Sequence, residues 1–438
     1  MSTSNRQNSS MKKDILKSYF SRYKHLSFIS LSAGINPLLM FLITYLVAIK
    51  LKKDSYAIFS SAWIVITILK SVSFFGLRES FLREYATKKT KFFELFSALI
   101  YSSIFYYIIC LLLLLSFSFF MSNSAESELY VSFSFFLLSY VLIEISNVVF
   151  MVKNKLNFLS INHFLQSLSL LVFIFFIGFG DLEFTLVSLS KAIFYSSIAA
   201  IVISFLLFRN ESHPFKGKTS LTNKIIKSKK LIKYGAFFGL GLIFQQFYNL
   251  SDQLLYRYYL GDLETLADYS LSYSLISATF ILPAVLYQKY LIPKMILNSH
   301  TNQKHNWSVI RKTIKPSLLI GLIVTSLFIL SIKFIEIYVF ENKYNLTYYC
   351  ILLSPNIIIL YLAMCYGSIL YTKHYYKKKV RYMGFTVIIN FVMNLILLPL
   401  IGIYSLILST LLSNTYILIS YRNYYNQVLK NISINEDL

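Results

Sequence analysis

Long apolar runs recur along the whole chain, and they constrain its fold more than any other feature. Between residues 26 and 421 these runs are repeatedly about 20 residues long with few or no charges. A helix of about 20 residues spans roughly 30 Å of hydrocarbon. Only 14% of the residues are charged, against roughly 25% in soluble domains. The runs exceed the strand length of an outer-membrane barrel and lack its alternation, so they predict an all-α polytopic membrane protein.

Breaking the runs at charged or turn-forming clusters predicts twelve transmembrane helices. The last two are separated at Pro399 and Gly402, because about 40 residues are too many for one span. The predicted spans are 26–49, 57–76, 93–120, 129–152, 156–179, 184–208, 232–260, 265–291, 313–335, 345–371, 382–400 and 402–421.

The distribution of Lys and Arg orients these spans. With a cytoplasmic N-terminus, 34 of the 42 basic residues fall in cytoplasmic segments or nearby span ends, 6 fall on the outer side, and Lys70 and Lys191 lie inside helices. Basic residues are retained on the cytoplasmic side of membrane proteins. We therefore predict that both termini are cytoplasmic. The net charge of +23 is explained by this topology, and no nucleic-acid partner is expected.

The most basic loop divides the spans into two sets of six. A weak similarity between TYLVAIKLKKDSYAIFS and QLLYRYYLGDLETLADYS suggests an internal repeat, with parallel copies related by an axis along the membrane normal. Residues 12–24 are expected to form a basic helix on the inner leaflet, with a disordered tail as the alternative. The predicted domains are a cytoplasmic amphipathic segment (1–25), an N-lobe (26–208), a basic cytoplasmic linker (209–231), a C-lobe (232–422) and a cytoplasmic tail (423–438).

Polar side chains form stripes at helical spacing on six of the spans. Such stripes must face protein or water rather than lipid, and they predict a polar cavity between the two lobes. The stripes are Trp63, Thr67 and Lys70; Tyr140, Glu144 and Asn147; Ser188, Lys191 and Tyr195; Gln245, Asn249, Asp252 and Tyr256; Ser270, Ser274 and Ser277 below Asp268; and Thr386, Asn390 and Asn394.

Each charged residue in these stripes has a simpler alternative explanation. Asp252 could pair with Arg257, although five positions on a helix place the two about 140° apart. Lys70 and Lys191 could extend their side chains to the nearest membrane surface. Glu144 is too short to reach the surface, so a functional role or an ion pair is expected. For Asn and Ser residues, hydrogen bonding between helices is the simpler role.

The chain contains none of the enzyme motifs HExxH, GxSxG or the P-loop. Its three cysteines, Cys110, Cys350 and Cys365, lie in separate apolar runs without CxxC spacing. Neither a disulfide framework nor a metal site is indicated. We predict no catalytic residues and no cofactor.

Two segments resemble a known group of transporters. They are LKKDSYAIFSSAWIVITILKSVSFFGLRESFLREYA (51–86) and SDQLLYRYYLGDLETLADYSLSYSL (251–275). Together with twelve spans in two sets of six, a basic central loop and short outer loops, they resemble the multidrug/oligosaccharidyl-lipid/polysaccharide (MOP) exporter superfamily. Within it, the chain is similar to Wzx-type O-antigen flippases.

The resemblance implies a MATE-like, V-shaped fold whose central cavity opens alternately to either side. It also implies a bacterial inner-membrane location and movement of undecaprenyl-diphosphate-linked repeat units to the outer leaflet, coupled to an ion gradient. Membrane lipids and the polymerase and chain-length proteins of the same pathway are the other implied partners. In this interpretation Lys70, Lys191, Asn249 and Asn390 would bind substrate, and Glu144, Asp252 and Asp268 would couple ion movement to transport.

Two other functions remain as alternatives. An O-antigen polymerase or ligase would resemble chains with a large periplasmic loop that carries catalytic Arg and His, whereas the longest outer loop here has about ten residues. A drug or cation exporter of the same superfamily would favour an acidic cavity, and the two intramembrane lysines argue against it.

Overall fold

The computed structural model describes residues 35–88, 92–121, 123–180, 184–209, 220–291, 303–371 and 375–434. Throughout these ranges the regular secondary structure is helical, and none of it is strand. The predicted basic helix at residues 12–24 lies outside the described residues.

The N-lobe is a bundle of apolar helices. It consists of an initial helix Ile35–Lys50, α2 (Lys53–Ser73), α3 (Leu77–Lys88), α4 (Phe92–Phe120), α5 (Ser124–Val152), α6 (Leu156–Gly180) and α7 (Leu186–Arg209).

The C-lobe follows with α8, which begins at Leu221 and therefore includes part of the predicted linker. Its elements are α8 (Leu221–Tyr259), α9 (Leu263–Thr279), α10 (Ile281–Pro283), η2 (Ala284–Leu291), α12 (Gln303–Phe334), η3 (Ile335–Val339), α13 (Leu346–Leu353), α14 (Pro355–Gly367), η4 (Ser368–Tyr371), α15 (Tyr376–Ile401) and α16 (Tyr404–Ile434).

Each of the twelve predicted spans overlaps a helix or a helical stretch of this structure. Nine helices in the described ranges are long and apolar enough to cross a membrane. The remaining three spans correspond to Ile35–Lys50, α8 and α16. Large apolar side chains such as Phe176, Phe205 and Leu330 are exposed on the outside of the bundles, as expected for surfaces in contact with lipid. The all-α membrane fold predicted from the sequence is therefore confirmed.

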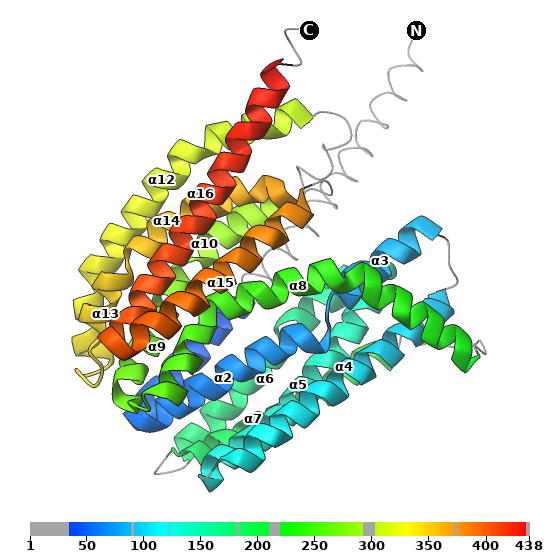
Figure 1. Cartoon of the computed structure of the whole chain (residues 1–438). Helices are drawn as coiled ribbons and strands as arrows, with labels where there is room; N and C mark the ends of the chain where they lie inside the picture. Colours follow the sequence, from blue (N-terminus) through cyan, green and yellow to red (C-terminus); the bar gives the residue numbers. More distant parts are fainter. Residues whose placement is uncertain are drawn as a thin grey trace, which may run out of the picture.

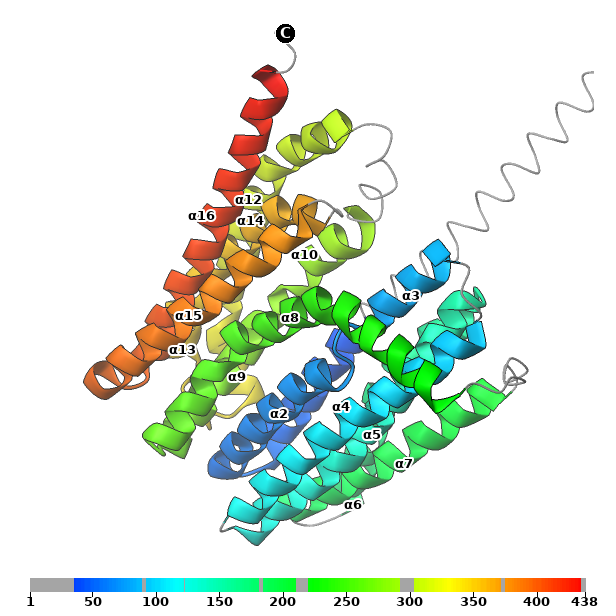
Figure 2. The same ribbon diagram turned by 45° about the vertical axis from the view of Figure 1, so that its right-hand side comes forward.

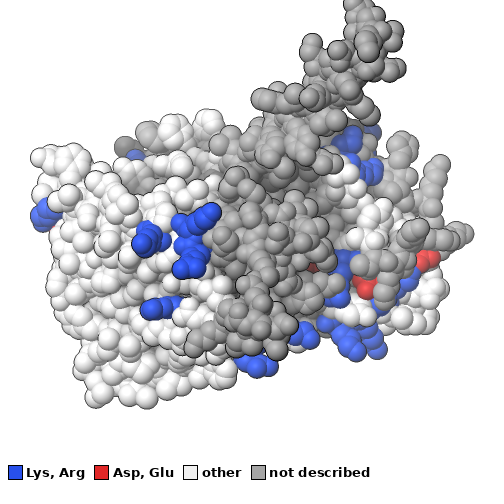
Figure 3. All heavy atoms as spheres, turned by 90° about the horizontal axis from the view of Figure 1, so that it is seen from above, with Lys and Arg blue, Asp and Glu red and all other residues white. Residues whose placement is uncertain are grey.

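The two bundles form a V (Figure 1). They meet where α2 packs against α9, and they diverge toward the end at which α16 terminates; a second view shows the same arrangement (Figure 2). Seen from that wide end, the face carries many Lys and Arg side chains and few acidic ones among the described residues (Figure 3). By the rule that basic residues stay inside, the wide end is the end expected to face the cytoplasm.

Helix α8 arches from one bundle to the other (Figure 1). Its first part packs on α3 and α4, where Lys230 pairs with Glu84 at 2.8 Å, and its later part packs on α15. Between these two parts, Gly235 of α8 meets Gly76, whose φ is +59°. A Cβ atom on Gly76 would lie 2.1 Å from the Gly235 carbonyl oxygen. Glycine at both positions therefore allows the two backbones to cross in contact.

Candidate functional site

A cavity of about 290 Å³ lies between the lobes. The initial helix and α2 line it from the N-lobe, and α8 and α9 line it from the C-lobe. Its lining combines aromatic rings with hydroxyl and amide groups, and no charged side chain is among the lining residues. The polar and aromatic members are Phe41, Thr44, Tyr56, Phe59, Ser60, Trp63, Thr67, Gln253, Ser270, Tyr273, Ser274 and Ser277.

Two of the polar stripes seen in the sequence meet across this cavity. Trp63 and Thr67 come from the α2 stripe, and Ser270 and its two successors come from the α9 stripe. The Trp63 ring also packs against Phe133 and Phe136 of α5, with centroid distances of 5.8 and 5.5 Å. These contacts fix the ring at the cavity wall.

The α8 stripe is oriented differently from the prediction. Gln253, rather than Asp252, lines the cavity, and its side-chain oxygen accepts a hydrogen bond from the Ser270 hydroxyl at 2.7 Å. Asp252 is fully buried inside the C-lobe and accepts hydrogen bonds from the hydroxyls of Tyr269 and Thr410, both at 3.1 Å. The expectation that Asp252 faces the cavity is thus corrected, because its side of α8 packs against α9 and α16.

A second cavity, of about 150 Å³, lies within the N-lobe and shares Met40 with the first. It contains Lys70, whose ammonium lies 4.4 Å from the ring centroid of Phe136 and 4.9 Å from that of Tyr140. The cation is therefore held by aromatic faces rather than by a carboxylate in direct contact. The other polar lining residues are Asn36, Tyr140, Glu144, Asn147, Asn162, His163, Gln166 and Ser167.

Glu144 lines the same cavity but is held in an ion pair. The guanidinium of Arg78 lies 3.2 Å from Glu144 Oε2 and also binds Glu79. In contrast, neither polar atom of the Asn162 side chain has a hydrogen-bond partner among the described residues, although both are buried. Buried amides are normally hydrogen-bonded, so this cavity offers both donors and acceptors to an incoming group.

The remaining predicted substrate residues do not line either cavity. Lys191 is exposed near the start of α7, where it lines a separate groove with Glu128 and Tyr195. Asn249 is half-buried on α8. Asn390 is fully buried, and its Oδ1 accepts from Asn394 Nδ2 at 3.2 Å. The structure therefore brings Lys70 and Glu144 together and leaves these three apart.

Three basic side chains bridge the lobes at the narrow end of the V, the side expected to face outward. Lys53 of α2 lies 3.0 Å from Asp268 of α9. Arg257 of α8 lies 2.5 Å from Glu126 of α5 and also donates to the carbonyl oxygen of Ile58 at 3.3 Å.

The third bridge is Lys343, in the loop before α13. Its ammonium donates to the carbonyl oxygens of Ala48, Ile49 and Leu51 at the end of the initial helix. Cations are favourable at a helix C-terminus, where carbonyl groups lack intrahelical partners. Partial burial lowers the pKa of Lys343. Together the three bridges join the lobes at the narrow end, and the V is open at the end expected to face the cytoplasm.

These bridges bear on two interpretations made from the sequence, the pairing of Asp252 and the role of Asp268. Arg257 pairs with Glu126 and not with Asp252, so local pairing of Asp252 is excluded. Asp268, predicted to couple ions, is the acidic half of a bridge between lobes and also accepts from the Asn345 backbone at 3.1 Å. Lys53, Glu126 and Lys343 were missed by the sequence analysis. Lys53 and Lys343 could have been found from the sequence, because they are among the few basic residues predicted on the outer side.

The described residues contain no group of three or more His, Cys, Asp or Glu side chains that could hold a metal ion. The three cysteines are buried and free.

Comparison with known proteins shows the family and the fold of the chain. A model of the polysaccharide biosynthesis protein family matches residues 23–299. No curated protein matches the chain. Among solved structures, an inward-facing multidrug resistance MATE family transporter of the MOP superfamily has a TM-score of 0.67 at 12% identity, covering 92% of this chain and 99% of that one.

Two further structures show the same fold. A variant of the Vibrio cholerae MATE transporter VcmN has a TM-score of 0.65 at 12% identity, covering 95% of this chain and 98% of that one. An outward-facing MATE family transporter has a TM-score of 0.59 at 13% identity, covering 93% and 96%. The resemblance drawn from the sequence is confirmed: the chain belongs to the polysaccharide biosynthesis protein family and has the fold of MATE transporters of the MOP superfamily.

Proposed function

We propose that this protein is a flippase that moves undecaprenyl-diphosphate-linked O-antigen repeat units from the cytoplasmic to the outer leaflet of the bacterial inner membrane. The family match supports a role in polysaccharide export. The finer assignment rests on one observation, the chemistry of the cavity between the lobes.

That cavity suits a sugar better than a cationic drug. Trp63, Phe59 and Tyr273 offer flat apolar faces, and the surrounding Ser, Thr and Gln groups offer hydrogen-bond donors and acceptors. A saccharide presents both kinds of surface, whereas an organic cation would favour a carboxylate in the lining, and none is present among the lining residues. An isoprenoid tail would remain in lipid, since only the polar headgroup needs a substitute for its hydration.

Lys70 supplies positive charge next to this cavity. The two cavities adjoin at Met40, so a headgroup with its sugars between the lobes could place an anionic group near the Lys70 ammonium. A charged group in hydrocarbon is costly unless it is paired. In this proposal Lys70 offsets part of that cost for the diphosphate or an acidic sugar.

Transport would require the outer bridges to open while the wide cytoplasmic end closes. Rocking of two six-helix lobes about a central site is a common form of alternating access. Protonation or cation binding at Asp268 would weaken its pairing with Lys53, which links ion movement to opening. Asp252 and Glu144 are the other proposed coupling sites, and the polymerase and chain-length proteins of the pathway are proposed partners.

The test is a flipping assay with the full chain reconstituted in liposomes. Undecaprenyl-diphosphate-linked oligosaccharides are placed in both leaflets, and a membrane-impermeant glycosidase reports how much headgroup reaches the outside. We expect wild-type protein to expose more headgroup than empty liposomes and Trp63→Ala to lose this activity. Phe176→Ala, on a lipid-exposed face, is the matched control. Export of an organic cation by wild-type protein, without flipping of any repeat unit, would contradict the proposal.

A further inference from the structure

A groove on the surface of the N-lobe lies between α5 and α7, which pack against each other. Its volume is about 250 Å³, and all of its lining residues come from these two helices. Glu128 and Val131 line it from α5, and Lys191 and Tyr195 line it from α7. It shares no lining residue with the central cavity or with the cavity around Lys70. The groove is therefore a separate feature of the lobe.

Glu128 and Lys191 bring opposite charges to this groove at the same depth. Both side chains are exposed. Since α5 begins at Ser124 and α7 at Leu186, each charge lies about 6–8 Å beyond the start of its helix, at 1.5 Å per residue. The headgroup layer on each side of a bilayer is about 5–7 Å thick. The two charges thus lie at the level where lipid headgroups meet acyl chains.

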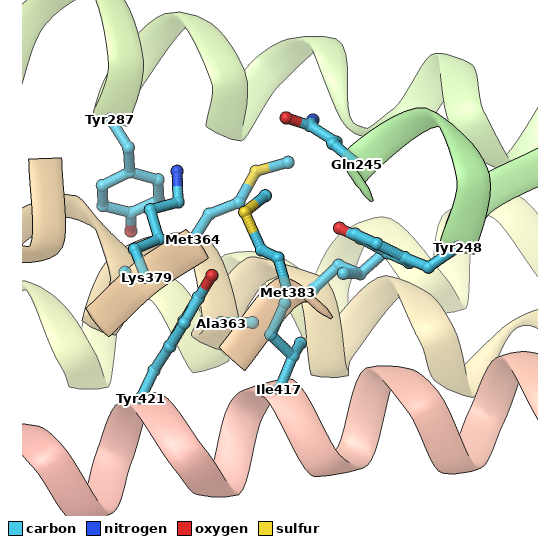
Figure 4. Close-up of a pocket in the computed structure, with 11 residues that line it drawn as sticks. Gln245, Tyr248, Tyr287, Ala363, Met364, Lys379, Met383, Ile417 and Tyr421 are labelled. Carbon is cyan, nitrogen blue, oxygen red and sulfur yellow. The ribbon is translucent and has the colours of Figure 1, made fainter. Parts of the chain in front are cut away.

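Neither charge is paired within the part of the chain that the structure describes. No ion pair, hydrogen bond or ring contact there involves Glu128 or Lys191. Lys379 of α15 differs, because its side chain extends into a pocket of the C-lobe (Figure 4) and has an interaction of its own. Extension toward the membrane surface explains the position of Lys191 but not an unpaired acid in the same groove. Two opposite, unpaired charges fit a ligand that carries both.

Beyond the charges, the exposed surfaces of both helices are apolar. On α5, Val131 and Phe135 follow the acid at the third and seventh positions, and both are exposed. On α7, Ile198 and Val202 follow the lysine at the seventh and eleventh positions and are also exposed. These spacings keep the residues on one face of each helix. The surface is therefore polar at one end and apolar along the rest, as a phospholipid is.

We propose that this groove binds a bilayer phospholipid with a phosphoethanolamine headgroup. The Glu128 carboxylate accepts hydrogen bonds from the lipid ammonium, the Lys191 ammonium donates to the phosphate, and an acyl chain packs along Val131 and Ile198. A short ethylene link joins the two charges of this headgroup, so one molecule reaches both side chains. The glycerol headgroup has no ammonium, and the choline headgroup has no N–H to donate.

This site is independent of the proposed transport path. All of its lining residues belong to the N-lobe, so a bound lipid does not bridge the lobes. The ligand is a lipid of the surrounding bilayer, and it stays at the surface of one lobe while substrate passes between the two.

Native mass spectrometry of the full chain in detergent tests this proposal by counting the lipids that stay bound. Phosphatidylethanolamine, phosphatidylcholine and phosphatidylglycerol with identical acyl chains are titrated separately. The variants are Glu128→Gln and Lys191→Met, each of which removes one charge and keeps a side chain of similar length. Glu264→Gln, which removes an exposed acid near the start of α9 in the other lobe, is the control. Thermal unfolding of each variant confirms that it is folded.

We expect the wild-type protein to bind phosphatidylethanolamine most tightly. Glu128→Gln should weaken this binding by roughly tenfold, to the level of phosphatidylcholine, since it removes a charge-assisted hydrogen bond. Lys191→Met should weaken binding of all three lipids, because each has a phosphate. Glu264→Gln should leave all three affinities unchanged.

Two results would overturn the proposal. Equal affinities for the three lipids, unchanged in Glu128→Gln and Lys191→Met, would show a nonselective lipid layer around the protein. Tightest binding of phosphatidylglycerol, retained in Glu128→Gln, would show that the groove selects negative charge alone and that the acid takes no part.

Discussion

The ion pair between Arg257 and Glu126 should hold the outer side closed, and its removal should open that side. The pair joins α8 of one lobe to α5 of the other at 2.5 Å. Its two side chains are 8% and 6% exposed. In Glu126→Ala, the guanidinium keeps the Ile58 carbonyl oxygen as a hydrogen-bond acceptor and the Tyr258 ring at 5.5 Å, and it loses its carboxylate partner. Removing one member of a buried pair costs about 3–5 kcal/mol, because the other charge remains buried.

This cost applies only to the state in which the outer side is closed, since opening would hydrate Arg257. Taking the lower value of about 3 kcal/mol, the equilibrium shifts toward the outward-open state by roughly a hundredfold, at 1.4 kcal/mol per factor of ten. The same shift is expected for Arg257→Ala, which leaves Glu126 buried without its cation.

Electron paramagnetic resonance distance measurements can detect the shift. Spin labels on Ser124→Cys and Glu264→Cys, both exposed and on opposite lobes, report the width of the outer side. The native cysteines are buried, so they should label poorly. We expect a short distance in the otherwise wild-type protein and a longer one in Glu126→Ala. Glu128→Gln, an exposed acid on the same helix, is the control. An unchanged distance distribution in a folded Glu126→Ala protein would refute the reasoning.

Three further outcomes are expected. Gly76→Ala should lower the thermal unfolding temperature strongly, because its Cβ would lie 2.1 Å from the Gly235 carbonyl oxygen. Gly261→Ala is the control, with φ +74° and open space around it, and should lower this temperature less. Equal decreases in the two variants would show that the close contact with Gly235 is not the cause of the destabilisation. Lys70→Ala should reduce flipping in the liposome assay by roughly tenfold, as expected for losing a charge-assisted contact, and Lys70→Arg should remain partly active. Full activity of Lys70→Ala would exclude this residue from substrate binding. Asp252→Asn should change how flipping depends on the imposed ion gradient. Asp262→Asn, at the exposed N-cap of α9, is the control and should leave this dependence unchanged. The same gradient dependence in both variants would exclude ion coupling at Asp252.

The sequence predicted the membrane architecture because hydrocarbon imposes a simple rule. Every backbone group must be hydrogen-bonded within the span, so length, apolarity and basic flanks are sufficient signals. Trp63, Thr67 and Ser270 of two predicted stripes line the cavity between the lobes, because polar groups on a span must turn away from lipid. Lys70 of the first stripe lies in the separate cavity within the N-lobe.

The direction in which a buried side chain points was harder to predict. Asp252 and Gln253 are adjacent on α8, but one faces the inside of the C-lobe and the other faces the cavity. Helical spacing gives the relative positions of residues and not which neighbouring helix they meet. Contacts between lobes, such as Lys53 with Asp268, join residues 215 positions apart, which no local pattern reveals.

The arch of α8 has a consequence for how the two lobes could move. Its first part is fastened to the N-lobe by pairs such as Lys230 with Glu84, and its later part belongs to the C-lobe. If the lobes rock, α8 must turn about the contact between Gly76 and Gly235, because this contact lies between its two attached parts. A displacement of the first part of α8 would then be transmitted along the continuous helix to Arg257, which lies in its last turn. The two sides of the membrane would therefore be linked mechanically, so that closing one favours opening the other.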